Sequence, residues 1–424
     1  MTMKKVVLIL LGLLLAATAV FGGWRWYDSN VDRGGWDTED EAIIYRDFHG
    51  DKVTGWQEIE GKRYYFGEDG ILCSGWLVLD GSRYWLGFAG ELQTGWQEVD
   101  GQRRYFGTNG AMVTGWQQID GKRHCFDEHG TLVTGWVEQE DGRYYLDSDG
   151  SPVTGTVTVD GTNYNFRKDG TLITGWYEGG YYLADGTQAF GWQEIDGQTY
   201  CFGEDGTMIT GWVEEGEYRY YLREDGTMAV GPNQINGDTY YFTPKGIHLW
   251  IVNPWIELRE DYTVELAEVV AGYRIAAVCE EAFNRMMEDC KAAGLNPELI
   301  SGYRTYWDQQ ALYMEKVAEY GVAAGSQIVA KPNTSEHQLG YAVDIVASGN
   351  YTLNKTQGDT RVQRWLMENC WDYGFILRYP EGSTDITGII YEPWHYRYVG
   401  VEVAMDLKEL GVTLEEYLGA VKPQ

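Results

Sequence analysis

The chain has 424 residues, which is long enough for two to four domains. Hydrophobic residues make up 44% of it and charged residues 23%, a globular composition that excludes wholesale disorder. The 33 basic and 64 acidic residues give a net charge of -31, which argues against nucleic acid or anionic lipid as an electrostatic partner. The 55 Gly, 18 Trp and 32 Tyr favour a repetitive chain of tight turns and aromatic faces.

The first 23 residues predict export. Two lysines precede an apolar run at residues 6–21, the pattern of a secretory signal, and residues 17–19 offer a small-residue cleavage site. Extended to residues 6–24, the run is long enough to span a bilayer. We slightly favour an uncleaved membrane anchor over a cleaved signal, and a buried core helix is the least favoured interpretation. With either export segment, everything after residue 23, beginning with a linker at 24–35, lies outside the cytoplasm.

From Trp36 the sequence repeats with a period of twenty residues, shortened once to sixteen. Most units begin with Gly-Trp, and Thr156 and Pro232 replace the Trp in two of them. Each unit also carries two turn signals, commonly Asp-Gly or Asn-Gly, which supply the positive φ of a tight hairpin turn. Because a hairpin this short cannot bury its own face, the pattern predicts an all-β solenoid of stacked hairpins over residues 36–246.

Most aromatic rings of these repeats are expected in the core, since a unit has little else to bury. Rings of adjacent units would also frame shallow slots for sugar rings or quaternary ammonium groups. The recurring GW, YYF and DG words resemble the choline-binding and glucan-binding cell-wall repeats of Gram-positive surface proteins. That resemblance implies a wall-ligand role for Trp56, Trp76, Trp96, Trp116, Trp136, Trp176, Trp192 and Trp212.

One departure from the choline-binding pattern concerns the position directly before the Tyr-Tyr pair. The choline-binding version usually has a second Trp there, which completes an aromatic cage. In this chain six units have arginine instead: Arg63, Arg83, Arg103, Arg123, Arg143 and Arg219. Because a cation in the cage wall opposes a quaternary ammonium ligand, we expect a glycan or other wall polymer rather than choline.

After Gly246 the period ends and an α+β domain is predicted for residues 247–424. An apolar stripe from Ile275 to Met287 predicts a helix that ends at Gly294. The other predicted elements are helices at 308–320 and 361–373 and strands at 299–301, 342–346, 375–377 and 394–399. Of the six cysteines, Cys279 and Cys290 are about 16 Å apart along one predicted helix, too far to bond. We interpret all six as small buried residues and leave a tertiary disulfide with Cys370 open.

Two short polar segments near the C-terminus carry the candidate chemistry. The imidazoles of His337 and His395 and the carboxylate of Asp344 form the ligand set of an open zinc site. The carboxylate of Glu392 would then take a proton from water. Pro393 argues against a mid-helix position for Glu392, so this is not the helical two-His protease motif. From these residues alone, satisfied polar core or loop residues are the commoner alternative.

Four sequence motifs, in the same order as in the family, resemble those of the VanY-type D-alanyl-D-alanine carboxypeptidases, which are zinc peptidases of the bacterial cell wall. These motifs are Ser301–Arg304, Ser335–Asp344, Gly374–Pro380 and Glu392–Arg397, within about residues 250–400. The resemblance implies that His337, Asp344 and His395 bind Zn²⁺ and that Glu392 is the base. It also implies that Arg304 faces the substrate carbonyl or oxyanion, and that Ser335 and Gln309 contact substrate.

The sequence therefore predicts an exported zinc D,D-carboxypeptidase that trims peptidoglycan stem peptides and is held on the wall by its repeats. We place it at the extracellular face of a Gram-positive-type bacterium, membrane-anchored or secreted and wall-bound. The alternatives are an L,D-carboxypeptidase or endopeptidase of the same fold, or an inactive wall-binding adhesin. The complete His-Asp-His-Glu set argues against the adhesin. The oligomeric state and the wall ligand stay open.

Overall fold

The computed structural model describes residues 34–423, which fall into two compact units. The first unit consists of the described residues up to Tyr177 together with the segment Tyr182–Thr187. The second consists of Glu178–Tyr181 and the chain from Gln188 onward.

The signal or anchor predicted at residues 1–23 lies outside the described residues, as does nearly all of the linker at 24–35. Among the described helices, none is long and apolar enough to cross a membrane.

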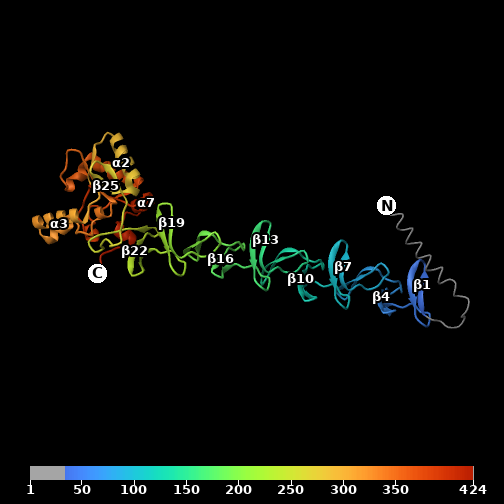
Figure 1. Ribbon diagram of the computed structural model, residues 1–424. Coiled ribbons are helices and arrows are strands. Elements are labelled where there is room, and N and C mark those ends of the chain that lie inside the picture. Colours follow the sequence, from blue (N-terminus) through green and yellow to red (C-terminus); the bar gives the residue numbers. More distant parts are fainter. Residues whose placement is uncertain (1–33, 424) are drawn as a thin grey trace. The chain divides into compact units, whose positions relative to one another are not determined.

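In the first unit each repeat folds into a two-stranded antiparallel hairpin, and the hairpins follow one another in chain order (Figure 1). Its strands are β1 (Gly35–Glu39), β2 (Ala42–Arg46), β3 (Gly55–Ile59), β4 (Lys62–Phe66), β5 (Gly75–Leu79), β6 (Ser82–Leu86), β7 (Gly95–Val99), β8 (Gln102–Phe106), β9 (Gly115–Ile119), β10 (Lys122–Phe126), β11 (Gly135–Gln139), β12 (Gly142–Leu146), β13 (Gly155–Val159), β14 (Thr162–Phe166) and β15 (Gly175–Tyr177). At the turn between β3 and β4, Glu60 and Gly61 have φ of 54° and 76°. Positive φ at both positions is what the turn signals predicted.

Neighbouring hairpins are joined by a backbone hydrogen bond and by ring contacts. The Leu92 N–H donates to the Arg63 carbonyl oxygen at 2.7 Å, and equivalent bonds recur along the repeats. Trp56 lies edge-on to Tyr65 of its own hairpin and to Tyr84 of the next, with ring centroids 5.2 and 5.3 Å away. The Gly-Trp rings therefore serve largely as the packing between repeats.

The second unit contains three further full hairpins and then an α+β fold. Its hairpin strands are β17 (Gly191–Ile195), β18 (Gln198–Phe202), β19 (Gly211–Glu215), β20 (Tyr218–Leu222), β21 (Gly231–Ile235), β22 (Asp238–Phe242) and the short β23 (His248–Leu249), and the chain enters them through β16 (Gly180–Tyr182). The α+β elements are β24 (Leu266–Val270), β25 (Tyr273–Ala276), η1 (Ala277–Cys279), α2 (Glu280–Ala292), β26 (Pro297–Ser301), α3 (Tyr306–Tyr320), α4 (Val322–Ile328), η2 (Glu336–Gln338), β27 (Ala342–Ala347), η3 (Lys355–Asp359), α5 (Arg361–Asn369), η4 (Cys370–Tyr373), β28 (Phe375–Leu377), α6 (Thr384–Thr387), β29 (His395–Tyr398), α7 (Val401–Leu410) and α8 (Leu414–Leu418). These elements confirm the predicted fold class of hairpin repeats followed by an α+β domain.

A four-stranded sheet in the order β26-β27-β29-β28 organises the α+β fold. Its main core, which includes Phe283, Met286, Val343, Ile345 and Leu366, lies between this sheet and helices α2 and α5. All six cysteines are free, and three of them belong to this core, so the disulfide left open for Cys370 does not form. Five of the six are buried as expected, but the expectation was wrong for Cys73, which is only partly buried.

One predicted helix begins later than its apolar stripe. Ile275 lies in β25 and Val278 in the 3₁₀ turn η1, and the α-helix begins at Glu280. The stripe was misleading because strand β25 and helix α2 bury side chains in the same core, which makes the apolar pattern continuous across two elements.

A second hydrophobic cluster, here called the junction cluster, includes both repeat residues and residues of the α+β fold. Val403, Leu407 and Leu418 of helices α7 and α8 are buried in it. Tyr218 and Tyr241 of the last hairpins, together with Tyr220, pack against it from the other side. The hairpins just before residue 246 therefore share a hydrophobic core with the C-terminal helices.

Candidate metal centre and active site

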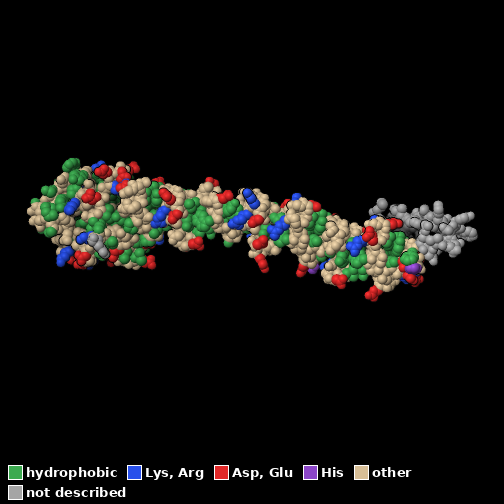
Figure 2. All heavy atoms as spheres, turned by 90° about the horizontal axis from the view of Figure 1, so that it is seen from below, with side chains coloured by type: hydrophobic (Ala, Val, Ile, Leu, Met, Phe, Trp, Pro, Cys, Tyr) green, Lys and Arg blue, Asp and Glu red, His purple; other side chains and the backbone are tan. Residues whose placement is uncertain are grey.

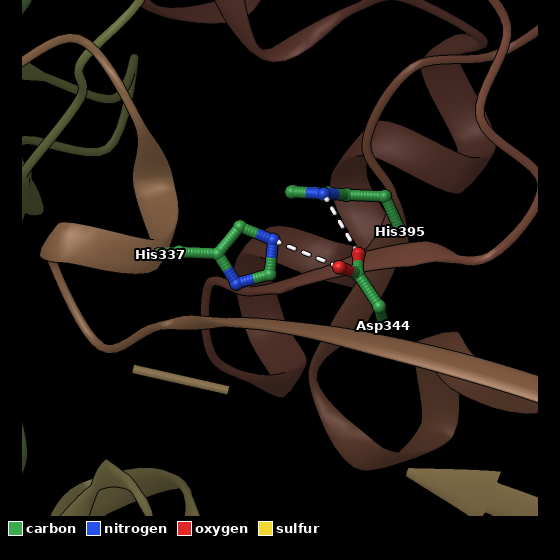
Figure 3. Close-up of side chains that lie close together, drawn as sticks. All are labelled: His337, Asp344 and His395. Atoms are coloured by element: carbon green, nitrogen blue, oxygen red, sulfur yellow. Dashed lines mark ion pairs between the residues drawn. The ribbon is translucent and has the colours of Figure 1, made fainter. Parts of the chain in front are cut away.

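Two of the predicted metal ligands are brought together by strand register. Asp344 in β27 lies directly opposite His395, the first residue of β29, in the antiparallel pairing. Side chains at opposed positions of an antiparallel pair lie on the same face of the sheet. Accordingly, His395 Nδ1 lies 3.2 Å from Asp344 Oδ1, as Figure 3 shows.

His337 reaches the same carboxylate from the 3₁₀ turn η2. Its Nε2 lies 3.2 Å from Asp344 Oδ2 (Figure 3). Its Nδ1 lies 2.8 Å from the Gly302 carbonyl oxygen, which can only accept, so Nδ1 carries the proton of the neutral ring. Nε2 is then left unprotonated and available to a metal.

Arg304 follows β26 and is held in place by three partners. Its guanidinium donates to Ser301 Oγ at 3.0 Å, to Gln309 Oε1 at 3.2 Å and to Asp344 Oδ2 at 2.9 Å. Gln309 itself is fully buried, and its amide nitrogen donates to the Ala330 carbonyl oxygen at 2.7 Å. The amide oxygen of Gln309 therefore helps to hold Arg304, while its amide nitrogen is anchored to the backbone.

Glu392 lies in the turn that leads into β29, where the His395 N–H donates to the Glu392 carbonyl oxygen at 3.1 Å. This position agrees with the inference from Pro393 that Glu392 is not in a helix. Its carboxylate Oε2 lies 3.5 Å from His395 Nδ1. Glu392 is therefore next to the two histidines and Asp344 without belonging to the cluster of three.

Burial and neighbouring charges separate the pKa values of these groups. Burial raises the pKa of Glu392 to about 8, because a carboxylate loses its hydration there. Burial, helped by the charge of Arg304, lowers the pKa of His337 to about 4. For His395, burial acts downward, but the carboxylates of Asp344 and Glu336 outweigh it and raise the pKa to about 9. A metal at His395 must therefore displace a proton, so metal binding should weaken in acid.

All of these groups line one cavity of about 710 Å³. Ser335 also lines it and is buried. The structure therefore brings together in one cavity all seven residues predicted for the site: Arg304, Gln309, Ser335, His337, Asp344, Glu392 and His395. The cavity volume is in the range of ligand-binding pockets.

The cluster fits a zinc ion because its donor atoms are of the right type and because one buried carboxylate oxygen has no hydrogen-bond partner among the described residues. The ligand atoms of His337, Asp344 and His395 all lie within 4.8 Å of one another, and all three residues are buried. Asp344 Oδ1 is buried and has no hydrogen-bond partner in the described part of the chain. Two imidazole nitrogens and one carboxylate oxygen are a common set for an open zinc site.

Three buried charged residues near this cluster received no role in the sequence analysis. Glu336 accepts hydrogen bonds from Arg378 at 2.8 Å and from Arg397 at 3.0 Å. Glu336, Arg378 and Arg397 lie within the sequence motifs quoted above, but a sequence does not show that such charges are buried together. Position next to a ligand was the only available signal for Glu336.

In the repeats, the arginine that replaces the second cage Trp lies over the Gly-Trp ring. The guanidinium carbon is 4.0 Å from the ring centroid for Arg123 over Trp116 and for Arg143 over Trp136. The same stack forms at Arg63 over Trp56, Arg103 over Trp96 and Arg219 over Trp212. Arg83 forms no such stack, and Trp76 is covered instead by Arg104 of the next repeat at 5.2 Å. At most of these repeats an arginine of the chain itself therefore occupies the ring face to which a quaternary ammonium group would bind.

Aromatic side chains nevertheless remain accessible on the repeats. Trp76 is 39% exposed and Trp176 is 44% exposed. Figure 2 shows hydrophobic side chains along the surface of the repeats, interspersed with acidic and basic ones. Among the predicted wall-ligand residues, the Trp side chains thus combine packing with partial exposure.

Comparisons with known proteins match both parts of the chain. Residues 273–401 match the sequence profile of the family VanY, D-alanyl-D-alanine carboxypeptidase. The profile of the choline-binding repeat matches residues 53–89, 93–117, 113–151 and 189–232.

Among the relatives, the bifunctional D-Ala-D-Ala dipeptidase and carboxypeptidase VanXYC of Enterococcus gallinarum is 40% identical over 138 residues, which cover 30% of this chain and 70% of that protein. The chain belongs to the VanY family. A D-alanyl-D-alanine carboxypeptidase of Enterococcus faecalis is 42% identical over 183 residues, which cover 41% of this chain and 66% of that protein. The family and the repeat type suggested by the sequence words are thereby confirmed.

A solved structure of a VanY D,D-pentapeptidase from a VanB-type resistance cassette, in complex with Zn(II), is 43% identical to the VanY-type part. It covers 40% of this chain and 97% of that chain, with a TM-score of 0.37. This VanY-family chain spans 66%, 60% and 44% of the length of three curated carboxypeptidase relatives, in each case less than two thirds.

Proposed function

We propose that the chain is a wall-bound zinc D-alanyl-D-alanine carboxypeptidase that removes the terminal D-Ala from peptidoglycan stem peptides. The observation that carries this proposal is the buried Glu392 carboxylate, 3.5 Å from His395 Nδ1, beside the three-residue cluster in one open cavity. A base, a metal position and a fixed guanidinium are the parts that peptide hydrolysis needs. In the proposed division of labour, residues 247–424 carry the reaction and residues 36–246 hold the wall.

His337, Asp344 and His395 would hold the zinc. When bound, Zn²⁺ supplies a Lewis acid that polarises the scissile carbonyl and makes water more acidic. Glu392 accepts a proton from the attacking water at its carboxylate and then donates it to the leaving D-Ala nitrogen. Burial raises the pKa of Glu392, which makes its carboxylate a stronger base toward water than an exposed one.

Arg304 would stabilise the negative charge that develops on the carbonyl oxygen. Three hydrogen bonds already fix its guanidinium, so little reorganisation is needed during the reaction. Gln309 contributes by holding Arg304, and Ser335 lines the cavity, where its hydroxyl would contact the peptide. This assigns Gln309 a positioning role in addition to the substrate contact that the resemblance implies.

The substrate proposal is tested by weighing the products of purified stem peptides. We expect release of one D-Ala from pentapeptides, weak action on free D-Ala-D-Ala and none on a C-terminally amidated pentapeptide. A wall-tethered carboxypeptidase needs a free terminal carboxylate and a cleft that accepts polymer-bound peptides. Cleavage of the amidated peptide would identify an endopeptidase, trimming of tetrapeptides an L,D-carboxypeptidase, and no cleavage of any peptide an adhesin.

For the repeats, we propose a wall glycan or other wall polymer as the ligand, with the chain at the extracellular face, secreted or anchored through residues 6–24. The support is that arginine already lies over six of the Gly-Trp rings, for example Arg123 over Trp116 at 4.0 Å. An occupied ring face cannot also accept a quaternary ammonium group by cation–π attraction. Exposed aromatic faces remain for stacking on sugars.

This ligand proposal predicts that the full chain binds purified cell walls, that high salt barely elutes it and that millimolar choline does not. Stacking contacts are not screened by salt, and the net charge of -31 is repulsive toward an anionic wall. Elution can be followed by the fraction of chain released from sedimented walls. The matched variants are Arg123→Trp, which should create one choline-sensitive cage, and Arg123→Leu, which should not. Sharp choline elution of the unmodified chain would contradict the proposal.

A further inference from the structure

The buried carboxylate of Glu336 has one oxygen in use and one without a partner. Glu336 directly precedes His337 and is 1% exposed. Its Oε1 accepts hydrogen bonds from Arg378 Nε at 2.8 Å and from Arg397 Nη1 at 3.0 Å. Its Oε2 is buried and has no hydrogen-bond partner among residues 34–423. Buried polar atoms are nearly always paired, so the direction of Oε2 is informative.

His395 holds the complementary unpaired atom. Its Nδ1 faces Asp344 Oδ1 at 3.2 Å, on the side of the metal cluster. Its Nε2 is buried, has no hydrogen-bond partner in the described chain, and lies 3.6 Å from Glu336 Oε2. The ring of Tyr379 packs on the imidazole with centroids 4.8 Å apart, which limits its rotation. The two unpaired atoms thus face each other at a distance just beyond that of a hydrogen bond.

We propose that Glu336 positions His395 by accepting a hydrogen bond from its Nε2–H, which leaves Nδ1 unprotonated and directed at the metal. This inference rests on the proposed zinc function. Metal-binding imidazoles usually donate their other N–H to a carboxylate or carbonyl, which fixes the tautomer and the ring orientation. The Gly302 carbonyl already does this for His337. Glu336 does the same for His395.

The surrounding charges explain why Glu336 can hold this orientation. Arg378 also pairs with Glu415, its Nη1 donating at 2.8 Å, and Arg397 Nη2 donates to the Trp250 carbonyl oxygen at 2.6 Å. Two guanidinium groups and two carboxylates balance in charge, so the buried network needs no further counter-ion. Both guanidiniums hold Oε1 of Glu336, which leaves Oε2 for His395.

The decisive variant is Glu336→Gln. The two guanidiniums can only donate, so they will select the amide oxygen and turn the amide NH₂ toward His395 Nε2. That arrangement favours the opposite tautomer, with the proton on Nδ1, where the metal must bind. We expect the zinc dissociation constant to rise about 10–100-fold. The affinity is measured by chelator competition on the full chain.

The matched control is Glu415→Gln, which perturbs the same Arg378 without facing His395. It should lower the thermal midpoint but change the zinc dissociation constant by less than about threefold. If both variants weaken zinc equally, or neither does, Glu336 has only a structural role and the proposal is wrong.

A spectroscopic measurement tests the tautomer directly, even if Glu336→Gln does not fold. In the zinc-loaded wild-type chain with ¹⁵N-labelled histidine, His395 should show a protonated, slowly exchanging Nε2 and a metal-bound Nδ1. An unprotonated Nε2, or an Nε2–H that exchanges as fast as a free imidazole, overturns the proposal. A chain that binds no zinc at all would instead overturn the proposed function, so the two failures are distinguishable.

Discussion

Replacing Glu392 by glutamine should lower kcat/KM for D-Ala release by about 10²–10⁴-fold while leaving the zinc content unchanged. The amide has nearly the same shape but cannot accept a proton from water. Glu392 lies outside the three-residue cluster, so the metal ligands stay intact. Rates are measured on pentapeptide stems, and zinc is measured by mass spectrometry of the purified full chain.

The matched comparison is His337→Ala, which removes a ligand instead of the base. His337 Nε2 lies 3.2 Å from Asp344 Oδ2, so its loss opens the cluster, and both zinc and activity should disappear. Chelation of the wild-type chain should abolish hydrolysis, and added zinc should restore it. Full activity in chelator, with no metal detected, would rule out the mechanism.

Truncating the chain to residues 247–424 should destabilise the catalytic part by about 3–6 kcal/mol. The cut removes Tyr218, Tyr220 and Tyr241 from the junction cluster, and each partly buried aromatic contributes about 1–2 kcal/mol. A loss of this size is comparable with the whole stability of many domains. Urea unfolding followed by tryptophan fluorescence measures the change, relative to a chain that begins at residue 188.

The control for this truncation is Lys245→Ala in the full chain. Lys245 pairs with Asp406 at 3.0 Å and with Glu402 at 3.1 Å, but it is half exposed. Exposed ion pairs contribute about 0–1 kcal/mol, so this variant should unfold nearly as the wild type does. Equal urea midpoints for the fragments beginning at 188 and 247 would show that the hairpins add nothing to the catalytic core.

Features that depend on interactions between neighbouring residues could be predicted from the sequence alone. The twenty-residue period and the Gly turns predict hairpins because positive φ at two adjacent positions is a local requirement, met for example by Glu60 and Gly61. Helix ends were equally local: Gly374 adopts φ of 77° and ends the turn η4 where the pattern predicted a stop. The start of α2 was mispredicted because an apolar stripe reports burial and not which element is buried.

The ligand residues could be named from their types and from family words, but their convergence is a matter of tertiary structure. Asp344 and His395 are fifty-one positions apart in the printed sequence and meet because β27 and β29 pair with these two residues opposite each other. Sequence spacing carries no information about strand register between distant segments, since register depends on the pairing of whole strands.

The buried polar contacts likewise depend on how distant segments pack and could not be predicted from the sequence. The substrate contact of Gln309 stays a prediction, whereas the hydrogen bond that its amide oxygen accepts from Arg304 was not predicted. Glu336 was assigned no role from the sequence, although its unpaired oxygen faces His395. For the arginines that lie over most of the Gly-Trp rings, the sequence predicted an effect on ligand choice but not the stacked geometry. A sequence names donors, acceptors and charges. Which of them lose water together, and so must satisfy one another, is settled only when the chain packs.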